Sequence, residues 1–321
     1  MLLPLALPED SLGSAKGQGV KGMHHPAGSH SEILEWLTHL VGHHPMGAFP
    51  GEPSRRLFEA PLLGVAWGGD TLFGALRRII GPFHRLPLEV LQTAFPGESF
   101  PEEMVWVVCY VLPIERTARL ANRRQRRFPH PDWMLTKIHG EGFNEWLRAQ
   151  LVGWIRERGH RAVAPVLHPS FLQFPLLNGE ITSNWSERHA CFAAGMGTFG
   201  LSRGLITQAG MAVRVGTVVT DLPLVPTSRA YSSPHEHCLF LSRGECGRCM
   251  ERCPAGAITL QGQDKRSCQE HQMASLRRRG RSLGLGRQIT GLHLSCGLCQ
   301  TGVPCEDRVP GVKARVKSTS A

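Results

Sequence analysis

The most informative stretch of the sequence is the cysteine-rich segment from Cys238 to Cys305. It contains Cys246-Gly-Arg-Cys249-Met-Glu-Arg-Cys253-Pro254 and, further on, Cys296-Gly-Leu-Cys299. Eight of the chain's ten cysteines fall in this stretch. A Cys-x2-Cys-x3-Cys-Pro run is typical of bacterial ferredoxins, which bind 4Fe–4S clusters through cysteine thiolates, although the ferredoxin run begins with one further cysteine.

The spacing predicts two 4Fe–4S clusters with four thiolate ligands each. Cys238, eight residues before the run, can supply the cysteine that the run lacks. In two-cluster ferredoxins the last cysteine of each run ligates the other cluster. The expected ligands are therefore Cys238, Cys246, Cys249 and Cys305 for cluster 1, and Cys253, Cys268, Cys296 and Cys299 for cluster 2.

A single four-thiolate zinc site is the main alternative to the clusters. The pairs Cys246/Cys249 and Cys296/Cys299 have the spacing of such a site, but it leaves the other four cysteines of the stretch unexplained. Disulfides fit less well, because the apolar start of the chain is short and lacks the basic residue of a secretory signal. We expect a cytoplasmic protein, and no apolar run approaches the roughly 20 residues of a membrane span.

The net charge of +10 is concentrated in a few places. The basic groups are Arg116, Arg119, Arg123, Arg124, Arg126 and Arg127; then Lys265, Arg266, Arg277, Arg278, Arg279, Arg281 and Arg287; and, in the tail, Arg308, Lys313, Arg315 and Lys317. Such groups suit the phosphates of RNA or the surface of an acidic electron-donor protein, and they can also be a solvated surface with no partner.

Ahead of the cysteines, the sequence pattern alternates between strand and helix. Residues 104–112 are apolar on both faces, which indicates a buried central strand. Apolar residues at helical spacing predict a helix over 143–155. Residues 162–167 and 211–220 are further strand candidates around a helix at 186–194. This order indicates an α/β or α+β domain.

The chain of 321 residues is long enough for more than one domain. We expect an α/β domain at 101–235, a ferredoxin-like domain at 236–310 and a basic tail at 311–321. Residues 1–100 have no assigned structure apart from a short helix near residues 33–37. The six histidines of residues 1–50 are spaced irregularly, which favours a solvated segment over a second metal site.

Three glycines lie close together in Gly195-Met-Gly197-Thr-Phe-Gly200. This matches the dinucleotide-binding pattern, but a predicted helix precedes it where that pattern requires a strand. The glycines indicate either a backbone that a large planar cofactor approaches closely, or a tight turn.

The residues from Ser186-Glu-Arg-His-Ala190 to Gly195-Met-Gly197-Thr-Phe-Gly200, together with the first cysteine run, resemble the epoxyqueuosine reductase family, relatives of the reductive dehalogenases. The resemblance implies an α+β protein in which a nitroreductase-like α/β domain, possessing a cobalamin site, precedes a ferredoxin-like domain with two 4Fe–4S clusters. It implies that Arg188, Gly195, Gly197 and Gly200 contact the cofactor. It also implies a low-potential electron donor of the ferredoxin or flavodoxin type.

The chain departs from that family at the expected proton donor. Queuosine-making members have a catalytic Asp shortly before the acidic-Arg pair, whereas residues 181–186 here contain none. We therefore expect a different substrate, either a small molecule or a tRNA-borne group. Glu187, His189 and Tyr231 are the candidate proton donors. A helix-surface ion pair and a structural histidine are the alternatives for the first two.

Three functions follow from these features. The first is an iron–sulfur oxidoreductase that reduces a substrate through cobalamin or a similar cofactor. The second is a two-cluster electron-transfer protein without substrate chemistry of its own. The third is a tRNA-binding or modification-associated protein in which the clusters are structural.

Overall fold

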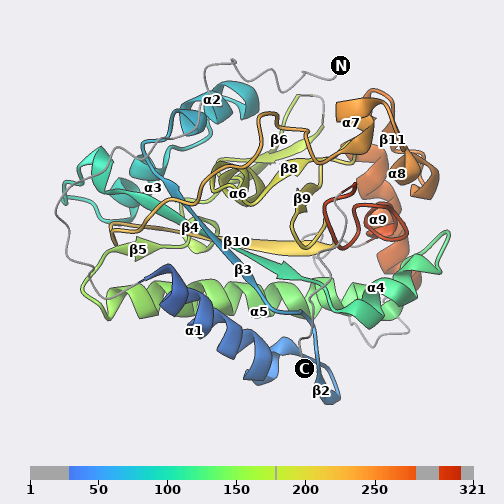
Figure 1. The fold of residues 1–321 in the computed structure, drawn as a ribbon, viewed down its shortest axis with the longest axis horizontal. Coiled ribbons are helices and arrows are strands. Elements are labelled where there is room, and N and C mark those ends of the chain that lie inside the picture. The colour runs from blue at the N-terminus through green and yellow to red at the C-terminus, as the bar shows by residue number, and fades with distance from the viewer. Residues whose placement is uncertain (1–28, 178, 280–295, 312–321) are drawn as a thin grey trace, which may run out of the picture.

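The computed structural model describes residues 29–177, 179–279 and 296–311 (Figure 1). His24, His25, Arg281, Arg287 and the predicted basic tail beyond residue 311 lie outside these ranges.

A four-stranded antiparallel sheet with the order β3-β4-β10-β5 lies at the centre of the fold. Its strands are β3 (Leu62–Trp67), β4 (Trp106–Pro113), β10 (Val213–Thr220) and β5 (Ala162–Val163). Strand β4 is buried along its whole length between β3 and β10, which confirms the central strand predicted from its continuous apolar run.

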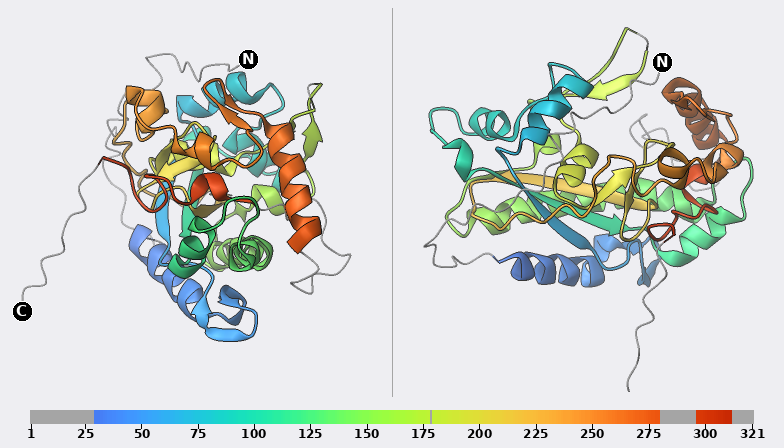
Figure 2. Two further views of the ribbon diagram at one scale, coloured as in Figure 1. Left: turned by 90° about the vertical axis from the view of Figure 1, so that its right-hand side faces the viewer. Right: turned by 45° about the horizontal axis from the view of Figure 1, so that its top comes forward.

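Helices cover both faces of this sheet (Figures 1 and 2). Helices α1 (His30–His43) and α5 (Pro131–Arg156) pack on one face, and α2 (Thr71–Ile80), α3 (Pro87–Ala94) and α6 (Glu187–Ala193) pack on the other. Successive side chains of a strand point to opposite faces. Val108 and Tyr110 of β4 therefore join the first core, while Val107 and Cys109 join the second. The fold is a mixture of helices and sheet.

Several elements differ in length from their predicted bounds. Helix α5 starts twelve residues before the predicted Phe143, because Pro131 occupies its first position and His130 accepts a hydrogen bond from the Asp132 amide. Strand β5 ends early, because Pro165 begins the 3-10 turn η4 (Pro165–Leu167). Helix α1 extends well beyond residues 33–37, since Ser29 and Glu32 form a capping box.

The segment before residue 100 belongs to the central sheet. Strand β3 pairs with β4 from Leu62 opposite Val111 to Trp67 opposite Trp106. The hairpin of β1 (Ala48–Phe49) and β2 (Glu52–Arg56) lies beside the start of α5. The sequence had assigned no strand here, because glycines interrupt the apolar pattern.

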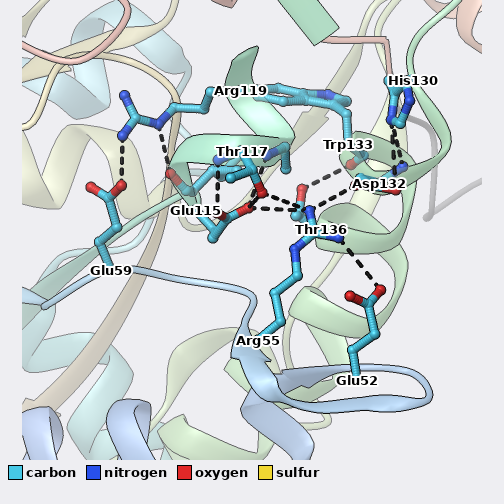
Figure 3. A network of polar contacts seen from close by, with 12 residues as sticks. Glu52, Arg55, Glu59, Glu115, Thr117, Arg119, His130, Asp132, Trp133 and Thr136 are labelled. Carbon is cyan, nitrogen blue, oxygen red and sulfur yellow. Dashed lines mark hydrogen bonds and ion pairs between the residues drawn. The ribbon is translucent and has the colours of Figure 1, made fainter. Parts of the chain in front are cut away.

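Arg55 of β2 ties this hairpin to the two helices that follow β4 (Figure 3). Its Nη2 atom lies 2.7 Å from Asp132 Oδ2 of α5 and 3.3 Å from Glu115 Oε2, the residue that caps α4 (Arg116–Arg123). Arg55 also donates to the Thr117 hydroxyl. Because the cation reaches partners on two helices, it fixes their relative positions.

The remaining elements are one long helix, α9 (Lys265–Arg279), and a set of short helices, turns and strands. They are η2 (Pro45–Gly47), η3 (Glu102–Met104), β6 (Gln173–Pro175), β7 (Ile181–Ser183), β8 (Gly197–Phe199), β9 (Leu205–Thr207), α7 (Leu239–Arg243), α8 (Arg248–Arg252), β11 (Ile258–Thr259), β12 (Gly262–Gln263), α9 (Lys265–Arg279) and η7 (Leu298–Gln300). The last six of these carry or flank the cysteines. None of the helices in the described ranges has the length and apolarity needed to cross a lipid bilayer.

The returning segment 296–311 joins the cysteine-containing region to the sheet. The Met211 amide donates to the Cys305 carbonyl at 2.8 Å, and the Ala212 amide donates to the Glu306 carbonyl at 3.1 Å. Gly210 has a φ of +76°, and a Cβ there would lie 2.4 Å from the backbone of Glu306. Only glycine suits this close approach.

Gly216 of β10 tests the packing of the sheet. A Cβ at Gly216 would lie 2.1 Å from the Tyr110 ring, whose hydroxyl donates to Asn144 Oδ1 at 2.8 Å. We expect Gly216→Ala to lower the free energy of unfolding by about 1–3 kcal/mol through overpacking. The control is Gly42→Ala in α1, where a Cβ meets no atom within 4 Å. It should be neutral or stabilise by up to about 1 kcal/mol. Urea denaturation of both variants measures the difference, and equal effects would contradict this account.

Candidate functional site

The first group of cysteine thiols gathers where segment 296–311 meets the sheet. Burial raises the pKa of Cys305 to about 12, with further contributions from Cys238, Cys249 and Cys246. The pKa of Cys249 is raised to about 11 by burial and by Cys238 and Cys246. The four thiols predicted for cluster 1 are therefore close enough to influence one another, although Cys305 lies more than fifty residues beyond the others.

The second group of thiols contains the other four cysteines. Burial raises the pKa of Cys296 to about 12, and Cys268 and Cys253 add to the shift. The pKa of Cys299 is raised well above its usual range by burial and then by Cys296, Cys268 and Cys253. Cys253 thus joins the second group although it stands in the first sequence run. Ligation itself stays a prediction.

The first group lines an apolar cavity. Cys238, Cys246, Cys249 and Cys305 share its wall with apolar residues that include Leu201, Ile206, Met211 and Phe240. Within residues 29–177, 179–279 and 296–311, no three His, Cys, Asp or Glu side chains converge as ligands of one metal ion. In a 4Fe–4S cluster the four cysteines bind four different iron atoms, so their sulfur atoms stay further apart than the ligands of one ion.

Arg252 positions the loop that carries Cys296 and Cys299. Its side chain is buried, and its Nε atom donates to the Leu298 and Thr301 carbonyls at 3.2 and 2.9 Å. Its Nη1 atom donates to the Gln125 carbonyl at 2.8 Å. One guanidinium therefore connects the end of α8, the returning loop and the segment after α4.

Asn122 and Trp133 fix the same loop from the side of α4 and α5. The fully buried Asn122 amide donates to Thr301 Oγ1 at 3.1 Å and to the Cys296 carbonyl at 3.4 Å. Gly297 has a φ of +62°, and a Cβ there would lie 2.1 Å from the Trp133 ring. The loop can therefore pass over the tryptophan only with glycine at this position.

Glu187, a candidate proton donor, forms a buried ion pair with Arg148 of α5. Arg148 donates from Nε to Oε1 at 2.9 Å and from Nη2 to Oε2 at 2.6 Å. The amide and hydroxyl of Thr217 also donate to Oε1. Burial raises the pKa of Glu187, and Arg148 opposes that shift. Every polar contact of this carboxylate is with a donor, which favours its ionised form and a structural role over proton donation.

Three further charged side chains extend this network along α5 and β10. Glu141 lies 3.2 Å from Arg148 and 3.4 Å from Lys137. Burial would raise the pKa of Glu141, but Lys137, Arg148 and Arg214 hold it at about 2. Burial lowers the pKa of Lys137 to about 8, helped by the positive charge of Arg214. The network contains three cations, which are Lys137, Arg148 and Arg214, and two anions, which are Glu141 and Glu187. It therefore has one excess positive charge.

Arg214 and Arg188 are the least satisfied cations of this region. The Nε atom of Arg214 is buried without a hydrogen-bond partner in the described part of the chain. Arg188 donates from Nη1 to the Arg203 carbonyl at 2.9 Å. Its side chain reaches solvent, yet enclosure by surrounding protein lowers its pKa, as does Arg203. These two residues can donate hydrogen bonds to an anionic or carbonyl-bearing ligand.

His189 and Tyr231, the other candidate proton donors, are held by the protein itself. His189 Nδ1 lies 2.7 Å from Ser186 Oγ, and burial together with Arg188 lowers its pKa to about 3. Its imidazole is therefore neutral at pH 7. The Tyr231 side chain is 6% exposed, its hydroxyl donates to the Phe192 carbonyl, and burial raises its pKa. This geometry favours structural roles for both residues.

Two of the three glycines predicted to contact a cofactor lie close to protein backbone on the side where a side chain would project, and their contact with a cofactor stays a prediction. A Cβ at Gly195, where φ is +74°, would lie 2.6 Å from the Ser228 carbonyl oxygen. At Gly197 it would lie 2.3 Å from the Ile206 carbonyl oxygen, across the β8–β9 pair. Gly200 lines the cavity of the first thiol group. The tight-turn interpretation thus fits better, because the space beside Gly195 and Gly197 is occupied by the chain's own carbonyls.

The sequence interpretation missed the network residues of α5. Lys137, Glu141 and Arg148 are separated by four and seven residues, so they share one face of the helix. Polar residues repeated on one face of an otherwise apolar segment were the signal that could have identified them. Their partners on α6 and β10 could not be inferred, since they come from distant parts of the chain.

Comparisons with known proteins give only remote similarities. No protein-family model and no curated protein matches the sequence. A solved epoxyqueuosine reductase aligns with a TM-score of 0.45 and 14% identity, over 87% of this chain and 68% of its own. An epoxyqueuosine reductase from Bacillus subtilis gives 0.42 and 14%, over 87% and 68% of the two chains. A catabolic reductive dehalogenase gives 0.42 and 13%, over 88% and 37%. At this TM-score and identity the likeness does not assign a function to the chain.

Replacing Glu187 tests the structural role of the buried ion pair. We expect Glu187→Gln to lower the free energy of unfolding by about 3 kcal/mol, because buried Arg148 loses its compensating charge. The matched control is Glu145→Gln, an exposed position on α5, which should change it by less than about 0.5 kcal/mol. Chemical denaturation measures both. A Glu187→Gln variant as stable as the control would show that the pair contributes little.

The lowered pKa of Lys137 predicts that the free energy of unfolding depends on pH in the alkaline range. Its folded pKa is lowered to about 8 from an ordinary 10.5, so between these values the unfolded chain binds a proton that the folded chain does not. The free energy of unfolding should therefore rise across this window, by up to about 3 kcal/mol. Lys137→Met removes this contribution. Denaturation series at several pH values measure the difference between the two proteins, and parallel curves would contradict the lowered pKa.

Proposed function

We propose that this protein is an iron–sulfur oxidoreductase that carries single electrons through two 4Fe–4S clusters. The observation that carries the proposal is the division of eight thiols into two groups of four. Each group combines cysteines from different parts of the chain: Cys305 joins Cys238, Cys246 and Cys249, and Cys253 joins Cys268, Cys296 and Cys299, as in the ferredoxin arrangement.

The chemistry of the donors fits this assignment. Buried, mutually close thiols hold their protons, as the raised pKa values of Cys249, Cys296 and Cys305 indicate. Thiolates in such surroundings require a nearby positive charge, which the iron atoms of a cluster provide. When bound, a 4Fe–4S cluster supplies one-electron transfer at potentials that reach about −400 mV or lower. The chain's own residues position the ligands through Arg252, Asn122 and the Met211 contact with Cys305.

Cobalamin is the second cofactor that we propose, on the resemblance of the 186–200 segment to epoxyqueuosine reductases. The support in this structure is the buried Nε atom of Arg214, which has no hydrogen-bond partner among the described residues and lies in the positively charged surroundings of Lys137 and Arg148. A cobalamin carries a phosphate and several amides, and these cations can hold such groups. When bound, it supplies a low-valent cobalt nucleophile for reductive removal of oxygen or halogen from a small-molecule or tRNA-borne substrate in the cytoplasm.

An electron-transfer protein without substrate chemistry is the alternative. Two observations favour this alternative. Backbone carbonyls lie close to Gly195 and Gly197, and Glu187, His189 and Tyr231 form contacts within the protein. Anaerobic purification with iron, sulfide and cobalt analysis, before and after addition of cobalamin, separates the two. About eight irons with cobalamin uptake support the reductase. The same iron content without uptake supports the carrier, and zinc without iron refutes both.

Cys253 tests the predicted exchange of ligands between the two clusters. We expect Cys253→Ala to impair cluster 2, whose other ligands are distant in sequence, and to leave cluster 1 intact, so the iron content falls from about eight towards four per chain. Cys191→Ala, which removes a buried thiol outside both groups, is the control and should retain all iron. Iron analysis and electron paramagnetic resonance of the reduced proteins measure the outcome. Full occupancy of both clusters in Cys253→Ala would refute the exchange.

A further inference from the structure

Two arginine-rich segments about 150 residues apart in sequence meet on one surface. The arginine surface consists of Arg124, Arg126, Arg127, Arg277 and Arg278, all exposed. None of them forms an ion pair within the described ranges, whereas the neighbouring Arg119 and Arg123 are paired with Glu59 and Glu306. The surface therefore presents five positive charges without carboxylates to neutralise them.

Phe128 holds the two segments together. Arg127 lies over its ring at 5.4 Å, and Arg278, from the end of α9, lies over it at 5.2 Å. The His271 ring stacks on it at 5.8 Å with an angle of 9° between the planes. Phe128 therefore holds Arg127 and Arg278 close together. Because these three neighbours pack on its ring, the ring is less accessible to a stacked base.

The arginine surface adjoins the second thiol group through both of its segments. Gln125, between Arg124 and Arg126, accepts the Arg252 hydrogen bond that continues to the carbonyls of Leu298 and Thr301 on either side of Cys299. On the other segment, Arg277 and Arg278 lie at the end of α9, the helix that carries Cys268 near its start, so the closer link runs through Gln125. The first thiol group instead faces the sheet, where Cys305 meets Met211.

We propose that the arginine surface docks an acidic flavodoxin-type electron carrier, which delivers electrons to cluster 2. This inference rests on the proposed function. Five cations that form no ion pair among the described residues complement an acidic carrier and steer its approach, and the Gln125–Arg252 link brings the first segment close to the loop that carries Cys296 and Cys299. RNA would use the same charges, but single-stranded RNA binding also relies on exposed aromatic rings for base stacking, and the Phe128 ring is partly buried and already contacts Arg127, Arg278 and His271.

The transfer step involves one electron and no bond. The fully reduced, anionic flavin of the carrier gives up one electron and becomes the neutral semiquinone. A cluster held by Cys253, Cys268, Cys296 and Cys299 would take up that electron, which would lower its charge by one unit, and a cluster held by the first thiol group would be the next acceptor.

Binding of the oxidised carrier tests the surface without depending on catalysis. The variants are Arg126→Glu and Arg277→Glu, one from each segment, and neither side chain forms an ion pair or a hydrogen bond with the described residues. The matched control is Arg78→Glu, which is also exposed and belongs to α2, a helix separated from α9 along the long axis of the molecule (Figure 1). At low ionic strength, calorimetry with an acidic oxidised flavodoxin should show about tenfold weaker binding for each test variant, with binding by the control unchanged. Added salt should weaken binding by the wild type and shrink the difference.

Reduction of the holoprotein separates this proposal from the proposed function. With reduced flavodoxin, cluster reduction should slow about tenfold in the test variants, whereas dithionite should reduce all proteins alike. Failure of dithionite to reduce any iron–sulfur cluster would overturn the proposed function. Normal reduction by dithionite, with test variants that bind and accept electrons from flavodoxin as the wild type does, would overturn the docking surface alone. Loss of binding to an RNA stem loop, with flavodoxin binding unchanged, would also overturn it and assign the surface to RNA.

Discussion

The buried guanidinium of Arg252 is the interaction on which the cysteine-containing region depends. It joins three stretches that have no covalent proximity: the end of α8, the loop around Leu298, and the segment after α4. A buried charge is retained only when it is well hydrogen-bonded, and here every acceptor is a backbone carbonyl. Its hydrogen bonds therefore specify the path of the chain, and that path brings Cys296 and Cys299 to Cys253 and Cys268.

The second organising feature is the charge network between α5, α6 and β10. The carboxylate of Glu187 on α6 accepts hydrogen bonds from Arg148 on α5 and from Thr217 on β10. These bonds link the two helices, which lie on opposite faces of the central sheet. Such a network is expensive to bury, and it is retained because each member has a partner. Arg214 is the exception, since its Nε atom has no partner in the described residues. Glu187 and Arg148 satisfy each other's charge and hydrogen bonds, which marks them as a structural ion pair. Arg214 keeps a donor that is free among the described residues, so it can bind a ligand.

Much of the fold could be predicted from local pattern. The buried strand β4, the strand β10 and the helices α5 and α6 follow from apolar periodicity. The bounds were less predictable, because capping by Ser29 and Pro131 decides where α1 and α5 begin. Strand β3 was missed, since Gly64 interrupts its pattern, and its strand state comes from pairing with β4. The glycine motif was ambiguous for the same reason: only the neighbouring carbonyls reveal what Gly195 and Gly197 admit.

The sequence by itself determined the chemical character of the protein: eight cysteines at ferredoxin-like spacing, and dense positive charge. Thiolate number and spacing limit which metal centres can form, and that information is local. The tertiary structure decided which groups meet. It brings Cys305 beside Cys238, pairs Glu187 with Arg148, and places Arg127 and Arg278 on one ring. These contacts join residues from 39 to 151 positions apart, and the physical reason is that burial of two apolar cores, one on each face of β4, fixes where each helix and loop must lie.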